Sequence, residues 1–497
     1  MNRYFLITGA SGLLGSFLMR DCLRQGLPIA VLVRKSRIES AKGRVESILA
    51  GWESRLGCIL PRPIVLEGDI CQKDLGLSDS AQQWVGKNCH SLVHSAASLS
   101  FELDEETNEP WRSNLEGTRN ALEFARKVGI RKFHQVSTAY VCGLRTGKIL
   151  ESDVDVGQSL GNPYEESKLA AEKLVRTWEG IDTLTVHRPA IIVGDSQTGY
   201  TTTYHGFYTP LKVVHMLVGK VPASEMNVLF LLQALGLTGE ERKNFVPVDW
   251  VSSVMTHILA DESLHGRTYH LTPSNRVSIN EMTAVLSDAI QKLSIPALEK
   301  ASPDLLDSEG FEDIFRTQME TYQSYWRDDP EFGTANTLAA APEIPCPVID
   351  GEVMWRLAKF AVENNFGWPI SRPVPAPLDV GTQLLQRARS DRPLINGYAM
   401  ESPFCAVLEV SGPGGGEWTL QRQGPHLAEL FDGRADESLP HAYLSSHTFR
   451  RLASGETKAA DALRVGNLVV QGAGNSLDTV LDFVDHVAQQ LPKSNPS

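Results

Sequence analysis

The sequence predicts an α/β protein: a doubly wound parallel sheet with an added lobe, followed by a smaller C-terminal α+β domain. Three observations lead to this fold class. Short apolar runs alternate with amphipathic helical stretches as far as Pro189. A glycine-rich turn directly follows the first apolar run. A proline-rich stretch, 368–377, separates this part from a C-terminal part with a different pattern.

The apolar runs are short and bounded by turn residues, as expected for strands that are covered on both faces. The predicted strands are Tyr4–Thr8, Ile29–Val33, Ile64–Glu67, Ser91–Ser95, Phe133–Val136 and Leu184–His187. Helical patterns lie between them. Leu14–Leu23 ends before Gly26 and Leu115–Val128 ends before Gly129, and glycine at such positions accepts the left-handed backbone of a helix C-cap.

Beyond Pro189 the alternation breaks down, so we expect further parts. Residues 200–245, which contain the apolar stretch Met226–Leu237, are predicted to form an insertion that covers the ligand crevice. We divide the chain into a Rossmann-type domain (1–275), a mostly helical part of the substrate lobe (276–370), a proline-rich linker (371–384) and a C-terminal domain (385–490).

Composition narrows the function classes. The 497 residues carry a net charge of −13, which disfavours nucleic acid and anionic membranes as partners. The seven cysteines are scattered without a CxxC pair, so neither a disulfide framework nor a metal site is expected. No signal peptide is recognisable, and no run reaches the roughly 20 apolar residues that span a membrane. We therefore expect a cytoplasmic protein without an integral membrane segment.

The glycine-rich turn is the first motif that carries chemistry. Gly9 permits a tight turn, Gly12 lets the backbone approach a pyrophosphate, and Gly15 lets helix and strand pack closely. Phosphates then lie at the positive amino end of the helix. The strand–turn–helix context makes this a dinucleotide site. Its predicted cofactor-binding residues are Thr8, Gly9, Ser11, Gly12, Leu13, Leu14 and Gly15.

The ends of the second and third strands bear on which dinucleotide binds. Arg34 and Lys35, with Arg37 nearby, would pair with the 2′-phosphate of NADP, so NADPH is predicted rather than NADH. The alternative is a solvated basic strand end. Asp69 is placed to accept a hydrogen bond from the adenine amino group, or else to cap a turn.

A Tyr–Lys pair is the second motif. Tyr164 and Lys168 are four residues apart, so on a helix they share one face. A phenol has a pKa of about 10, and a neighbouring ammonium is expected to lower that pKa. A hydroxyl at the end of a preceding strand could hold a substrate carbonyl oxygen. Thr138 is favoured for this role, with Ser137 as the alternative.

Together these residues resemble the extended short-chain dehydrogenase/reductase superfamily over residues 1–275, and most closely its thioester reductase and fatty acyl-CoA reductase branch, the male-sterility-type NAD-binding proteins. The branch-like segments are Val136–Val141, Gly147–Glu151 and Asn162–Lys168. The resemblance implies Thr138 as the catalytic hydroxyl, Tyr164 as the proton donor and Lys168 as its partner. It adds further cofactor contacts at Ile70, Ser95, Ala96, Ala97, Asn114, Arg188 and Pro189, besides Tyr164 and Lys168.

The branch reduces acyl thioesters to aldehydes or alcohols with NADPH, and this is the expected function. The reductase motif begins at residue 4, so an acyl carrier protein is expected to act in trans, or else the substrate is an acyl-CoA. The same residues would also serve an alcohol or hydroxysteroid dehydrogenase or a sugar-nucleotide epimerase or dehydratase. A non-catalytic lipid-binding protein with a structural dinucleotide is a third reading.

The C-terminal part weakly resembles the sterol-carrier-protein-2-like fold. The segments that suggest it are Phe404–Val410, Trp418–Arg422, Thr448–Gly455 and Gly466–Gly472. The resemblance implies an apolar tunnel for a lipid-like ligand. The alternative is an assembly domain, with which the protein could form a homodimer.

Overall fold

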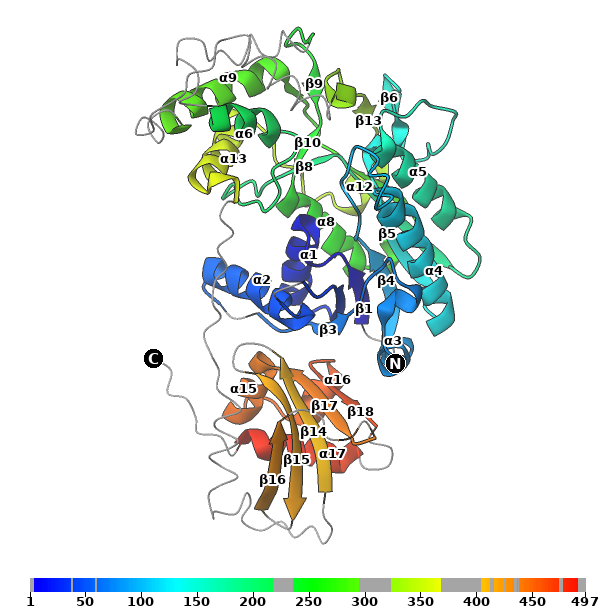
Figure 1. Cartoon of the computed structure of the whole chain (residues 1–497), viewed down its shortest axis with the longest axis vertical. Coiled ribbons are helices and arrows are strands. Elements are labelled where there is room, and N and C mark those ends of the chain that lie inside the picture. Colours follow the sequence, from blue (N-terminus) through cyan, green and yellow to red (C-terminus); the bar gives the residue numbers. More distant parts are fainter. Residues whose placement is uncertain are drawn as a thin grey trace.

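The computed structural model describes residues 4–36, 39–58, 60–217, 236–294, 323–367, 404–411, 415–423, 426–432, 436, 438–472 and 477–489. These residues form a large α/β part, with a helical lobe at one end and a smaller C-terminal domain at the other (Figure 1). The linker predicted at 371–384 and most of the stretch Met226–Leu237 lie outside the described residues.

A seven-stranded sheet forms the centre of the α/β part, and every neighbouring pair in it is parallel. The strand order is β11-β7-β5-β4-β1-β2-β3. Chain order reverses at β1, which lies between β2 and β4, and such a point is where ligands bind in open α/β sheets. The strands are β1 (Tyr4–Thr8), β2 (Ile29–Val33), β3 (Ile64–Glu67), β4 (Cys89–His94), β5 (Lys132–Val136), β7 (Thr183–Pro189) and β11 (Thr268–Leu271).

The predicted fold class is confirmed, and each of the predicted strands is present. Strand β11 was not predicted, because its sequence TYHL offers no apolar run. The left-handed C-cap expected after the fourth helix is present, with Gly129 at φ 81°. The helices of this part are α1 (Leu13–Arg24), α2 (Ala41–Leu56), α3 (Asp79–Asn88), α4 (Gly117–Val128), α5 (Pro163–Arg176) and α8 (Val248–Ala260).

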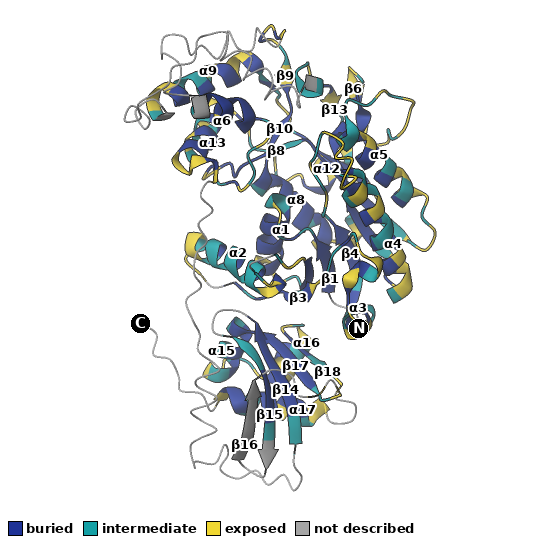
Figure 2. Cartoon of the chain, viewed as in Figure 1, coloured by how far each residue is buried: buried dark blue, intermediate teal, exposed yellow. Residues whose placement is uncertain are grey.

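Helices cover both faces of the sheet, as alternate residues of β1 demonstrate. Phe5 and Ile7 pack on one side with residues of α1 and α8, whereas Tyr4 and Leu6 pack on the other with residues of α3 and α4. The strands are accordingly buried, and exposed residues gather on the outer faces of α3, α4 and α5 (Figure 2). No helix among the described residues is long and apolar enough to cross a membrane.

The lobe has a core of its own over the carboxyl ends of the strands, to which Leu211, Met282 and Leu357 belong. Short strand pairs connect it to the sheet: β8 (Ile191–Val193) with β10 (Phe245–Pro247), β9 (Arg242–Lys243) with β12 (Val277–Ser278), and β6 (Lys148–Ile149) with β13 (Glu331–Phe332). Its helices are α6 (Tyr208–Leu217), α9 (Ile279–Ala289), α12 (Ala335–Ala340) and α13 (Gly351–Glu363).

The C-terminal domain is a mixed sheet of order β16-β15-β14-β17-β18, in which only β14 and β17 are parallel neighbours. Helices pack on one face, with Phe449, Leu452 and Val484 in the core. Its elements are β14 (Phe404–Ser411), β15 (Gly416–Gln423), β16 (His426–Asp432), β17 (His441–Ser445), β18 (Leu468–Gln471), α15 (Ser446–Ser454), α16 (Ala459–Arg464) and α17 (Leu477–Gln489). The predicted smaller α+β domain is present.

The other face of this sheet packs against the α/β part. Tyr443 and Val469 belong to the same apolar cluster as Tyr4 and Leu6. The Val65 amide donates to the Tyr443 hydroxyl at 3.2 Å, and the Tyr4 hydroxyl donates to the carbonyl of Gly466. The C-terminal domain therefore contacts the edge strand β3 and the amino end of β1.

Candidate active site

A cavity of about 320 Å³ lies between the carboxyl ends of the sheet strands and the lobe. The sheet side of its wall contains many of the predicted site residues. These are Gly9, Gly12, Leu13, Leu14, Gly15, Ser95, Ala97, Thr138, Tyr164, Lys168 and Pro189. The glycine-rich turn and the Thr/Tyr/Lys set are more than 100 residues apart in the chain and meet in this one cavity.

Of the three glycines in the glycine-rich turn, only Gly12 could carry a Cβ without overlap. Gly9 has φ +76°, and a Cβ there would lie 2.6 Å from the Ala96 nitrogen. A Cβ on Gly15 would lie 2.1 Å from the Gly9 oxygen, so no side chain fits at either position. At Gly12 the nearest atom is 3.4 Å away. No side chain caps the amino end of α1 there, which leaves room for an anionic group.

Thr8 and Ala96 hold this turn against the end of β4 and do not line the cavity. The Thr8 hydroxyl accepts a hydrogen bond from the Ala96 amide at 3.2 Å and lies 2.9 Å from Nδ1 of His94. Burial, together with the Lys168 charge, lowers the pKa of His94 to about 3. The neutral His94 ring can therefore accept a hydrogen bond from the Thr8 hydroxyl.

Tyr164 and Lys168 lie one turn apart on α5, as predicted. The Thr138 hydroxyl lies beside the Tyr164 phenol, whose anion it would stabilise, and it donates to the Pro189 carbonyl at 3.5 Å. The Lys168 ammonium donates to the Val136 carbonyl at 2.7 Å. Burial raises the pKa of Tyr164 to about 12 although Thr138 opposes this, and burial lowers the pKa of Lys168 to about 8 although Glu172 opposes this. The expected lowering of the tyrosine pKa is thus not found, because burial outweighs it.

The two neighbouring hydroxyls at the end of β5 have different partners. The Ser137 hydroxyl donates to the buried carboxylate of Glu172 at 2.6 Å. Thr138 faces Tyr164, and it also accepts from the Tyr140 amide at 3.2 Å. The two candidates for the catalytic hydroxyl, between which the sequence pattern did not decide, therefore have different surroundings in the structure.

The predicted contacts to the adenosine end lie outside the cavity. The Arg34 and Lys35 side chains are 66% and 74% exposed, and they form loose ion pairs with Asp69 at 3.9 Å and Glu67 at 3.5 Å. One Asp69 oxygen accepts from the Cys71 amide at 2.9 Å, so Asp69 does cap a turn.

A cation that the sequence analysis missed lies beside these residues. Arg44 on α2 donates to the Ser11 hydroxyl at 3.1 Å and to the Arg34 carbonyl. Its spacing from the glycine motif follows no pattern that could have revealed it.

Three other residues predicted to contact the cofactor do not line the cavity and have partners within the protein. Ile70 is buried, and its side chain packs where a Cβ on Gly117 would lie. Asn114 is buried and bonds Ser98 and the Ser167 hydroxyl of α5. Arg188 is fully buried, and its guanidinium pairs with Glu172 rather than facing the cavity. A charged group so deeply buried requires an ion partner, which explains the pair with Glu172. The cofactor contact at Arg188 stays a prediction.

The lobe side of the cavity is largely apolar and was missed from the sequence. Phe101 packs edge-on against both Tyr164 and Tyr325, with ring centroids 5.5 and 5.3 Å away. Further lining residues are Leu99, Ile191, Ile192, Phe245, Met282 and Trp326. They come from segments far apart in the chain, so no local spacing indicates them.

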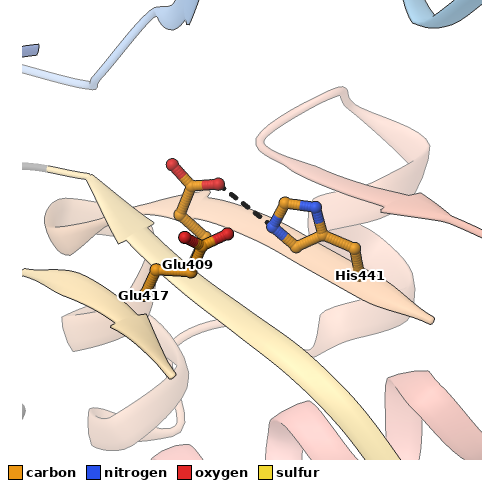
Figure 3. A group of neighbouring side chains, drawn as sticks. All are labelled: Glu409, Glu417 and His441. Atoms are coloured by element: carbon orange, nitrogen blue, oxygen red, sulfur yellow. Dashed lines mark ion pairs between the residues drawn. The ribbon is translucent and has the colours of Figure 1, made fainter. Parts of the chain in front are cut away.

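Three side chains of types that could ligate a metal ion lie together in the C-terminal domain. Glu409, Glu417 and His441 point toward one another from β14, β15 and β17 (Figure 3), and Nε2 of His441 lies 3.0 Å from Glu409. The Lys42 ammonium of α2 pairs with the same Glu409 carboxylate. A lysine of the chain itself therefore supplies positive charge to this cluster, and the ion pair joins the C-terminal domain to α2.

The fold and the cavity define the class: a Rossmann-type oxidoreductase that binds a nicotinamide dinucleotide. The family model described as "Male sterility protein", an NAD-binding family, matches residues 7–255, half of the chain. The chain belongs to this family.

Known proteins agree with this assignment. The chain is 26% identical to aldehyde reductase lnaA of Aspergillus flavus, a match that covers 72% of this chain and 36% of that protein. It is 29% identical to the chloroplastic fatty acyl-CoA reductase 2 of Arabidopsis thaliana, over 31% of this chain and 27% of that protein. The chain thus spans about a third of the length of these curated relatives.

Among solved structures, the terminal R domain from the myxalamid PKS-NRPS biosynthetic pathway matches with a TM-score of 0.56 and 26% identity, over 73% of this chain and 92% of that one. A thiolation-reductase di-domain from an archaeal non-ribosomal peptide synthetase shares the fold, with a TM-score of 0.52 and 18% identity. This match covers 74% of the present chain and 76% of the di-domain chain. The sterol-carrier-like character of the C-terminal domain stays a prediction.

Proposed function

We propose that the protein reduces an acyl thioester to an aldehyde, and onward to an alcohol where the aldehyde is retained, with NADPH as the reductant. The observation that carries this proposal is that Thr138, Tyr164 and Lys168 line the same cavity as the glycine-rich turn. A substrate carbonyl in this cavity lies within reach of both hydroxyls. The relatives named as an aldehyde reductase and a fatty acyl-CoA reductase support the same chemistry.

The turn with Gly9, Gly12 and Gly15 would hold the nicotinamide dinucleotide, which when bound would supply the hydride for the thioester carbonyl carbon. Thr138 and Tyr164 donate hydrogen bonds to the oxygen as negative charge develops on it. Because the pKa of Tyr164 is raised by burial, its phenol is protonated at neutral pH and serves as a donor. The Lys168 ammonium stabilises the phenolate that forms if Tyr164 gives up its proton. Collapse of the tetrahedral oxyanion breaks the carbon–sulfur bond and releases the aldehyde and the thiolate, which takes up a proton from solvent.

The preference for NADPH is part of the proposal. The Arg44 guanidinium bonds the Ser11 hydroxyl and the Arg34 carbonyl, and the Arg34 side chain is exposed, so both cations could serve as partners of an exposed phosphate. The carboxylate of Asp69 lies 3.9 Å from Arg34, so the 2′-phosphate would compete for that cation.

The apolar lobe side of the cavity favours a lipid-like acyl group, bound as a CoA ester or on an acyl carrier protein acting in trans. The solved thiolation-reductase di-domain shows a carrier beside a reductase of this fold, which supports the carrier route. No described residue of 404–489 lines the cavity. We therefore assign the C-terminal domain to assembly, homodimer formation included, rather than to holding the acyl chain.

A substrate panel tests the proposal. Purified protein is incubated with NADPH and acyl-CoA esters of increasing chain length, and NADPH absorbance and aldehyde formation are followed together. Turnover of thioesters that rises with chain length is expected. Turnover of an alcohol or a sugar nucleotide with no thioester reduced would favour the dehydrogenase or epimerase alternative, which uses the same side chains.

A further inference from the structure

Glu172 lies one turn beyond Lys168 on α5, and its side chain is fully buried. Tyr164, Lys168 and Glu172 follow at four-residue intervals, so they share one helix face. The proposed reaction uses the first two residues and gives the third no role. A buried carboxylate is costly unless it is fully paired, so its position on this face calls for a reason.

The Glu172 carboxylate connects three elements. It accepts from Arg188 of β7 at 2.6 and 3.1 Å, in a fork that uses both carboxylate oxygens. It accepts from the Ser137 hydroxyl, just beyond β5, at 2.6 Å. Arg176 of its own helix donates at 2.8 Å. The end of β5, strand β7 and helix α5 are thus fixed to one another through a single side chain.

The Glu172 carboxylate is connected to the proposed catalytic groups through Ser137, whose two chain neighbours contact Lys168 and Tyr164. Ser137, which Glu172 holds, lies between Val136, whose carbonyl accepts from the Lys168 ammonium, and Thr138, which lies beside Tyr164. A shift of α5 along its axis would change both of these contacts together. Through its bonds to Ser137 and Arg188, Glu172 resists such a shift.

The charges around Glu172 also support a role for its carboxylate beside Lys168. The cations near Glu172 are Lys168, Arg176 and Arg188. On the far side of Arg188, burial lowers the pKa of His270 to about 4, so that ring is neutral. Glu151 accepts from the amides of His270 and Asn336, and Asp153 pairs with Arg145. Burial would raise the pKa of Glu172, but Arg188 and the other donors hold it below the usual value, so the group is an anion.

We propose that Glu172 is a positioning residue of the active site, which fixes α5 against the ends of β5 and β7 and keeps the Lys168 side chain charged beside Tyr164. The proposal rests on the proposed function and names a residue that serves it. Removal of the carboxylate leaves Lys168 among cations with no balancing anion.

The test is the pH profile of Glu172→Gln, which keeps the shape and removes the charge. The alkaline limb of kcat for thioester reduction is expected to move down by about one pH unit, because Lys168 loses its proton more readily. The alkaline limb of NADPH binding, followed by tryptophan fluorescence, is expected to move with it. Lys173→Met removes an exposed cation from the same helix and is expected to leave both limbs in place.

Two more variants keep the test decisive. Glu172→Asp retains the charge but withdraws it from Ser137, so kcat is expected to fall about tenfold with the limb unmoved. If Glu172→Gln does not fold, Glu172→Gln/Arg188→Met removes the unpaired guanidinium and is measured instead. A wild-type limb in a folded Gln variant, or wild-type kcat in Glu172→Asp, would overturn the proposal. A wild-type protein that binds NADPH but reduces no thioester contradicts the proposed function alone. The alkaline limb of NADPH binding in Glu172→Gln then tests the role of Glu172 by itself.

Discussion

Two adjacent hydroxyls, Ser137 and Thr138, illustrate how the active site is specified at the residue scale. Both follow a buried strand, and both could meet a substrate carbonyl by sequence alone. The Ser137 hydroxyl donates to the Glu172 carboxylate, whereas the Thr138 hydroxyl lies beside Tyr164 and donates to the Pro189 carbonyl. The difference comes from a residue 35 positions further along the chain, so no local pattern could have revealed it.

Alanine at each position should therefore act differently. Thr138→Ala removes an oxyanion donor, so kcat is expected to fall by about 100-fold or more with NADPH affinity unchanged. Ser137→Ala leaves a buried acceptor less satisfied, so thermal stability is expected to fall by an amount equivalent to about 1–3 kcal/mol. Steady-state kinetics and thermal unfolding of both variants check this. Equal losses of kcat in the two would contradict the assignment.

The cofactor preference also depends on single residues. Arg44→Ala is expected to raise the KM for NADPH by about tenfold and to leave that for NADH unchanged, since only NADPH carries the 2′-phosphate. Arg55→Ala, on the same helix and away from Ser11, serves as the control. An equal rise for both cofactors would show that Arg44 supports the fold of this region rather than the phosphate.

At the scale of elements, the glycines in the turn between β1 and α1 have different roles: two are required by packing and one is expected to serve the cofactor. Gly9 and Gly15 leave no space for a Cβ, whereas Gly12 has its nearest neighbour at 3.4 Å and faces the cavity. Gly15→Ala is expected to destabilise the protein by several kcal/mol, because the added atom overlaps the backbone. Gly12→Ala is expected to weaken NADPH binding at nearly wild-type stability. Comparison of unfolding midpoints with NADPH titrations distinguishes the two, and a destabilised Gly12→Ala would argue against an open crevice there.

The elements that the sequence predicted are those whose signal is local. Parallel strands buried on both faces appear as short apolar runs, and the glycine turn and the Tyr–Lys pair have fixed spacings. Strand β11 has two polar residues among four and gives no such signal. Arg44, Phe101 and the partners of Arg188 depend on contacts between distant segments, so they emerged only with the fold.

At the scale of the whole molecule, buried histidines make stability depend on pH. Burial lowers the pKa of His94 and His187 to about 3 and that of His270 to about 4, while His134 lies well below its ordinary value. In the unfolded chain these rings take up protons below pH about 6.5. Stability is therefore full above that pH and is lost as the pH falls toward the folded values.

Each of these histidines should contribute up to about 1.4 kcal/mol per pH unit below 6.5. Urea unfolding at pH 7.5 and at pH 5.5 is expected to show a clearly lower free energy of unfolding at the acidic value. His187→Phe should make the dependence shallower. A free energy that is equal or larger at pH 5.5 would contradict this reading of the buried rings.

The contact between the two parts of the molecule is a further whole-molecule feature. Lys42 of α2 meets Glu409, and His441 lies against the same carboxylate. A double-mutant cycle of Lys42→Met and Glu409→Gln is expected to show a coupling of about 1 kcal/mol or more. The exposed pair of Lys359 and Glu363 should show less than about 0.5 kcal/mol. Equal coupling in both pairs would mean that the Lys42 pair does not hold the domains together.

The central claim is that one cavity holds both a nicotinamide dinucleotide and an acyl thioester. Incubation with NADPH deuterated at the transferable C4 position, followed by mass spectrometry of the trapped aldehyde, tests it most directly. One deuterium on the aldehyde carbon is expected, with the product lost in Tyr164→Phe. Bound NADPH with no labelled aldehyde from any thioester, or an equal yield from Tyr164→Phe, would contradict the account.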